Sequence, residues 1–162
     1  MGDQLSLRSL YTEEGMWYGS LDYSLPLGGS GLRGKVGYAH TYYELGKEFA
    51  DRDTVVLGGS TDNEFCKLAW RRDHGDLTSL PIWQFADNGG KFARDLGILD
   101  EAEGVALRAT FVVDPHNVVQ HVYVTNLNVG RAPADTLRVV DALQTDELCA
   151  CNRPVGGETL AA

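Results

Sequence analysis

Hydrophobic and polar positions in the middle of the chain alternate between helical and strand-like patterns. Residues 41–51 carry aromatic and aliphatic side chains at helical spacing, which predicts a helix. Residues 54–59 form an apolar, β-branched run that ends in two glycines, and this pattern is typical of a buried strand. From Thr61 to Glu64 the sequence has the T-x-x-E form of a capping box. We therefore expect Thr61 to cap a helix over about residues 62–73.

The second half of the chain continues this alternation. In chain order we expect a strand end and turn at 85–88, a short helix at 91–96 stopped by Gly97, strands at 109–113 and 118–124, and a helix at 133–145. The two strands form the clearest local feature, because a D-P-H-N turn separates two β-branched runs. The pattern predicts one α/β domain over residues 1–145 and a C-terminal tail over residues 146–162.

Charge and hydropathy exclude several classes of protein. The 162 residues have a net charge of -9. A negative charge opposes binding to the phosphate backbone of DNA or RNA, so no nucleic-acid partner is expected. No apolar run approaches the length that spans a membrane. The first residues have neither a basic start nor an apolar stretch, so no signal peptide is visible and we expect a cytoplasmic protein.

Three cysteines carry the candidate thiol chemistry: Cys66, Cys149 and Cys151. An odd number is a poor disulfide framework, so reduced thiols or a redox pair fit better. Cys66 follows the expected helix start but lies beyond the first free amides, which favours ordinary packing over catalysis. A disulfide between Cys149 and Cys151 would close a small, strained ring, so thiol exchange and two idle thiols on a flexible tail both remain open.

Metal and cofactor sites are not expected. No histidine stands beside the C-x-C pair to complete a zinc pattern. The four histidines are scattered through different predicted elements and favour structural roles. They are His40, His74, His116 and His121.

Several short motifs together carry a family resemblance. They are Gly2-Asp3-Gln4, residues 49–53, Ser60-Thr61-Asp62, Trp70-Arg71 with His74, residues 108–115, Val129-Gly130-Arg131 and residues 142–152. In these motifs the chain resembles alkyl hydroperoxide reductase C proteins of the peroxiredoxin family, closely so from about residue 47 to 152, and its last stretch is similar to that of actinobacterial members. The resemblance implies an α/β, thioredoxin-like fold with a central mixed sheet flanked by helices, shortened near residues 35–48.

The resemblance fails at the family's reactive loop. The chemistry of the family rests on a P-x-x-x-T-x-x-C loop whose thiolate attacks a peroxide and becomes a sulfenic acid. Between Gly34 and Phe49, where the loop and its preceding strand are expected, the chain has no cysteine, no proline and too few residues for a strand, a loop and a full helix.

Other parts of the family's site are matched. By resemblance, Arg108 and Arg131 correspond to two pocket arginines that stabilise the reactive thiolate and the peroxide, although each could instead pair with a surface carboxylate. Cys149 and Cys151 stand at the resolving position, where a thiol of one subunit forms a disulfide with the sulfenic acid of its neighbour.

These features lead to three functional hypotheses. The first is a peroxiredoxin-like protein without independent peroxidase turnover, which acts as an assembly or resolving-thiol partner. The second is an active thiol peroxidase or oxidoreductase using Cys149, Cys151 or Cys66, and the third is a decayed or rearranged gene product with a structural role. We expect a homodimer or higher ring built through the hairpin of residues 109–124, with an intact peroxiredoxin or a thioredoxin-like reductant as further partners.

Overall fold

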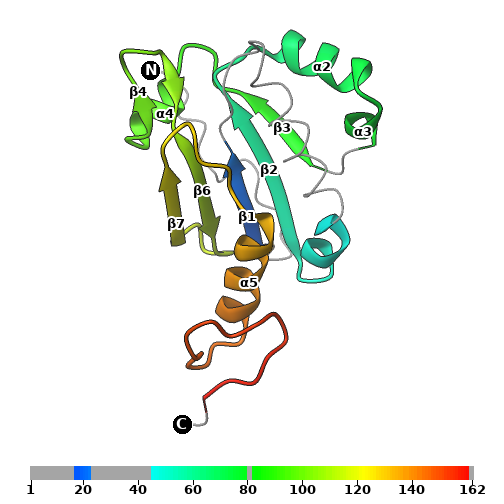
Figure 1. The fold of residues 1–162 in the computed structure, drawn as a ribbon, viewed down its shortest axis with the longest axis vertical. Helices are drawn as coiled ribbons and strands as arrows, with labels where there is room; N and C mark the ends of the chain where they lie inside the picture. Colours follow the sequence, from blue (N-terminus) through cyan, green and yellow to red (C-terminus); the bar gives the residue numbers. More distant parts are fainter. Residues whose placement is uncertain (1–16, 23–44, 80–81, 161–162) are drawn as a thin grey trace.

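The computed structural model describes residues 17–22, 45–79 and 82–160, and these contain a five-stranded mixed sheet (Figure 1). The strands lie in the order β3-β2-β1-β6-β7. Their bounds are β1 Trp17–Asp22, β2 Thr54–Ser60, β3 Trp83–Ala86, β6 Arg108–Val113 and β7 Val119–Thr125. A separate two-stranded sheet pairs β4 Leu99–Asp100 with β5 Val105–Ala106.

Helices flank the main sheet. They are α2 Glu64–Asp73, α3 Gly75–Thr78, α4 Lys91–Asp95 and α5 Pro133–Gln144, and residues 45–50 are also helical. The predicted helices at 91–96 and 133–145 and the predicted hairpin therefore form close to their expected bounds. The helix expected at 41–51 is confirmed from residue 45, since residues 41–44 lie outside the described part of the chain.

The start of α2 corrects one prediction. The helix begins at Glu64, and its N-cap is Asn63, whose Oδ1 accepts a hydrogen bond of 2.8 Å from the Cys66 amide. Thr61 lies two residues before the N-cap, so it does not form the expected capping box. Asparagine is as strong an N-cap as threonine or stronger, and its side chain reaches the third amide of the helix.

The centre of the sheet is occupied by β1, which comes from the N-terminal part of the chain. β1 pairs in parallel with β2, from Trp17 beside Thr54, and antiparallel with β6, where Tyr18 lies opposite Val113. The resemblance places the strand before the reactive loop after Gly34, but this central position is filled by residues upstream of Gly34. The shortened segment at 35–48 lies outside the described residues up to residue 44.

Glycine at position 59 permits close packing between β2 and β3. Gly59 pairs with Phe85, and a Cβ atom at Gly59 would lie 2.1 Å from the Phe85 ring. Any larger residue there would force the ring aside. Both glycines that end the apolar run fit a buried strand, and Gly59 is required for the close contact with Phe85.

Two apolar clusters lie on opposite faces of the sheet, because successive side chains of a strand alternate. Phe111 and Val113 of β6 join the cluster that includes Ala93 of α4. Val112 points the other way and packs with Val140 of α5. A sheet covered on both faces explains why β6 reads as a continuous apolar run.

Candidate functional site

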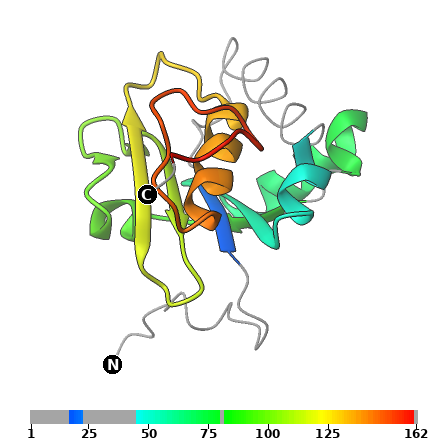
Figure 2. The same cartoon turned by 90° about the horizontal axis from the view of Figure 1, so that it is seen from below.

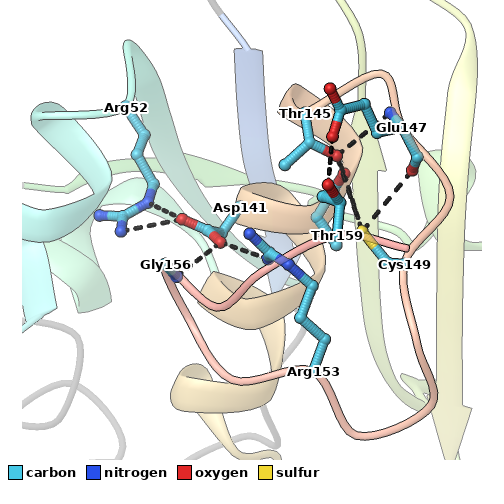
Figure 3. A network of polar contacts seen from close by, with 9 residues as sticks. Arg52, Asp141, Thr145, Glu147, Cys149, Arg153, Gly156 and Thr159 are labelled. Carbon is cyan, nitrogen blue, oxygen red and sulfur yellow. Dashed lines mark hydrogen bonds and ion pairs between the residues drawn. The ribbon is translucent and has the colours of Figure 1, made fainter. Parts of the chain in front are cut away.

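Cys149 lies just beyond the end of α5, in the tail that the sequence singled out. Its Sγ is 3.6 Å from the Thr145 hydroxyl and donates to the carbonyl oxygens of Glu147 at 3.6 Å and Ala142 at 3.9 Å (Figure 3). The thiol is half-buried, whereas Cys151 two residues later is exposed. Both cysteines are free thiols, but they differ in access to solvent.

The tail forms a loop beyond the C-terminal end of α5 (Figure 1), and in the view from below this loop lies under the helix (Figure 2). The Leu160 amide donates to the Leu148 carbonyl at 2.8 Å, and the Thr159 hydroxyl contacts the Glu147 carboxylate. Val155 packs against the apolar cluster that contains Val140. Residues 146–160 thus form a loop whose end returns to its start, while its middle contacts α5.

Asp141 of α5 organises the centre of this loop. Its Oδ2 accepts hydrogen bonds from Arg153 Nη1 at 2.6 Å and from the Gly156 amide at 2.9 Å (Figure 3). Its Oδ1 accepts from Arg52 Nε at 3.0 Å. The Arg153 side chain is only 5% exposed and that of Asp141 13%. One carboxylate therefore joins the tail, the last helix and the residues before β2, and we call this group the Asp141 cluster.

The environment of Asp141 favours its charged form. Burial alone would raise the pKa of the carboxyl, but hydrogen bonds from Gly156, Arg153 and Arg52 outweigh burial and hold the pKa below its usual value. A lowered folded pKa contributes stability that is complete above the usual Asp pKa of about 3.9. That stability is lost as the pH falls through the lower folded value.

Sequence reasoning did not find the Asp141 cluster. The partners of Asp141 are 89 and 12 residues away in the chain, at Arg52 and Arg153. Neither spacing matches a helical or strand period, so no local pattern could pair them.

Arg108 and Arg131 both form hydrogen bonds between β6 and the loop after β7. Arg108 is the first residue of β6, and its Nε donates to the Leu127 carbonyl in the loop after β7. Arg131, at the end of that loop, is buried, and its Nη1 donates to the Ala109 carbonyl at 3.1 Å. The structure therefore brings the two arginines to one region, where they tie β6 to the loop.

The arginines and the tail thiols are far apart within one chain. Arg131 precedes α5 and Cys149 follows it, and this helix of 12 residues spans about 18 Å. Figure 1 shows the loop from β7 to α5 and the tail beyond opposite ends of α5. The structure does not assemble the two sets of candidate residues into one intramolecular site.

The remaining candidates lie elsewhere. Cys66 is exposed on α2, which Figure 1 shows at the far end of the sheet from the tail. His74 follows α2 and its ring lies edge-on to Trp70, with 6.4 Å between centroids. Burial, with a smaller effect from the charge of Arg138, lowers the pKa of His121 on β7. His116 lies in the hairpin turn, and His40 is outside the described residues.

Neither a metal-binding cluster nor a membrane-spanning helix is found among the described residues. Within them, no group of three or more His, Cys, Asp or Glu side chains is arranged to hold a metal ion. None of the described helices has the length and apolar character needed to cross a membrane.

Comparison with known proteins decides the family. The model of the AhpC/TSA family matches residues 38–122, more than half of the chain. The chain belongs to this family. Alkyl hydroperoxide reductase C of Mycolicibacterium smegmatis is 50% identical over 119 residues, which are 74% of this chain and 60% of that protein. Peroxiredoxin TSA1 of Saccharomyces cerevisiae is 39% identical over 126 residues, 74% of this chain and 64% of the relative.

Solved structures agree with the AhpC/TSA assignment. AhpC of Mycobacterium tuberculosis superposes with a TM-score of 0.72 and 37% identity, covering 85% of this chain and 75% of that one. A reduced 2-Cys peroxiredoxin of Plasmodium vivax gives a TM-score of 0.76 at 25% identity, covering 88% and 75%. The predicted α/β, thioredoxin-like fold is thereby confirmed. The chain spans 60% to 64% of the length of the two curated relatives described above.

Proposed function

We propose that this AhpC/TSA-family chain does not reduce peroxides by itself and acts as a resolving-thiol partner of an intact peroxiredoxin. The observation that carries the proposal is the placement of Cys149 and Cys151 on a formed tail beyond α5, about one helix length from Arg131. The segment that should carry a reactive cysteine contains none between Gly34 and Phe49. A tail thiol can attack a sulfenic acid of another subunit, and this reaction does not need a reactive cysteine in the chain itself.

The proposed reaction is the condensation of a tail thiol with a partner's sulfenic acid, which forms a mixed disulfide and water. A tail thiolate attacks the sulfur of that sulfenic acid, the S–S bond forms as the S–O bond breaks, and the departing hydroxide takes up a proton to become water. The oxidising equivalents come from a peroxide that the partner's own cysteine has already reduced. A thioredoxin-like dithiol then reduces the mixed disulfide by exchange and is itself oxidised. Such thiols stay reduced in the cytoplasm, where we place the protein.

Arg108 and Arg131 have a supporting place in this proposal. They are the matches to the family's pocket arginines, and their contacts with Leu127 and Ala109 fix the start of β6 to the loop before α5. Because the tail thiols of the same chain lie at the other end of α5, we assign the two arginines to holding β6 against the loop before α5.

A mixed disulfide is the expected product when the protein meets an oxidised partner. An intact AhpC and this protein are mixed in equal amounts with one equivalent of hydrogen peroxide, and the products are separated by non-reducing electrophoresis. We expect a crosslinked heterodimer that the double variant Cys149→Ser, Cys151→Ser does not form. Cys66→Ser is the control and should crosslink as the unaltered protein does. Homodimers of the intact AhpC alone would contradict the proposal.

We also propose a symmetric homodimer, or a larger ring, assembled through the outer edge of β7. β7 ends the strand order of the main sheet, so its backbone offers an edge for pairing. Its exposed apolar side chains are Val119, Val122, Tyr123 and Val124.

The edge contact predicts a specific change in assembly. Val122→Lys places a charge on β7 and should convert the dimer to monomer in light scattering under reducing conditions. Val129→Lys is the matched control, because Val129 lies in the loop and is 46% exposed, against 49% for Val122. A monomeric unaltered protein at tens of micromolar, or a dimer that Val122→Lys leaves intact, would count against this interface.

A further inference from the structure

The tail is attached to the domain much more firmly after Cys151 than around Cys149. The contacts of the Cys149 sulfur are at 3.6 to 3.9 Å and involve a weak donor and acceptor. Four residues later, Arg153 makes a charge-assisted contact of 2.6 Å with Asp141. Charge-assisted hydrogen bonds are roughly twice as strong as neutral ones. The position of Cys149 therefore depends on an anchor elsewhere in the tail.

Arg153 is the tail residue best placed to be that anchor. Its side chain is buried, its Nη1 contacts Asp141, and its own amide donates to the Ala150 carbonyl at 3.2 Å, which turns the chain between Cys149 and Arg153. Asp141 also holds the Gly156 amide. The segment that carries both thiols is thus tethered between the end of α5 and the Asp141 cluster (Figure 3).

We propose that Arg153 is a positioning residue whose ion pair with Asp141 docks the tail and limits access to the Cys149 thiol. Opening of this pair exposes Cys149, while Cys151 is accessible in either state. Two thiols separated by one residue therefore differ in how easily a partner can reach them. The inference deepens the proposed function, because it concerns which tail thiol a partner can reach, but its test needs no partner.

The test measures the alkylation rate of each cysteine in the full chain with iodoacetamide, by mass spectrometry of the labelled peptides. We expect Arg153→Gln to raise the Cys149 rate about tenfold, the factor that corresponds to roughly 1.4 kcal/mol of lost docking. Cys151 is the internal reference and its rate should not change. Loss of a nearby positive charge disfavours a thiolate, so electrostatics alone would slow Cys149. An increase therefore reports exposure.

Arg52→Gln provides the matched control. It removes the other ion pair of Asp141 without altering the tail, so the Cys149 rate should stay near that of the unaltered protein. Arg153→Lys keeps the charge and should give an intermediate rate, and it replaces Arg153→Gln if that variant does not fold by circular dichroism. An unchanged Cys149 rate in the Arg153 variants, or equal increases in the Arg153 and Arg52 variants, would overturn the inference. Failure of the mixed disulfide with a normal alkylation pattern would instead overturn the proposed function.

Discussion

Hydrogen peroxide mixed with the purified protein should be consumed no faster than by an unactivated cysteine thiol. Rapid reaction requires a thiolate held beside groups that stabilise the charge developing on the peroxide. The candidate groups are Arg108 and Arg131, and Arg131 and the tail thiols lie at opposite ends of α5, a helix about 18 Å long. Cys66 is on a different helix and is exposed.

Competition kinetics measure this rate, with the AhpC of Mycolicibacterium smegmatis assayed alongside as an intact relative. We expect the protein to be slower by orders of magnitude, and single Cys→Ser changes at positions 66, 149 and 151 to have only small effects. A rate like that of the intact relative, abolished by one of these changes, would contradict the proposal. That result would favour a thiol peroxidase built on the cysteine concerned.

Phe49→Ala should destabilise the fold by about 3–5 kcal/mol, the usual cost of removing a large aromatic side chain from a core. Phe49 is 1% exposed and packs in the cluster that contains Val112 and Val140. It joins the helix at residues 45–50 to the sheet directly after the shortened segment. The Phe49→Ala change therefore tests whether the helix at residues 45–50 is part of the hydrophobic core.

Urea denaturation measures the change in the free energy of unfolding. Glu48→Ala is the control, since Glu48 precedes Phe49 on the same helix but is exposed, and a change within about 0.5 kcal/mol is expected there. A loss below about 1 kcal/mol for Phe49→Ala would mean that this helix is not part of the core.

Local patterns were enough to predict most elements downstream of residue 45. The hairpin of β6 and β7 was predicted because its two β-branched runs flank a turn that contains proline and asparagine. The helix α5 was predicted because Leu137 and Val140 recur at helical spacing, and both are buried. The error at Thr61 arose because Asn63 competes for the same role two residues later and reaches the Cys66 amide.

Features that depend on distant residues were not predictable. β1 is a short strand among glycines, and its central place is decided by pairing with β2 and β6, which are far away in sequence. The candidate thiols Cys149 and Cys151 were found from the resemblance, but their different exposure became visible only in the folded tail. The Asp141 cluster was missed as well, because a single sequence does not connect Arg52 and Arg153 to Asp141.

The most direct test of the central claim uses an intact AhpC whose own resolving cysteines are replaced by serine, so that its sulfenic acid has no thiol to react with. This partner is treated with one equivalent of peroxide in the presence or absence of the protein, and disulfide-linked peptides are identified by mass spectrometry. We expect a disulfide from Cys149 or Cys151 to the partner's peroxide-reactive cysteine, and we expect no such disulfide with the Cys149→Ser, Cys151→Ser variant. A partner cysteine that is oxidised beyond the sulfenic acid to the same extent with and without the protein would contradict the proposal.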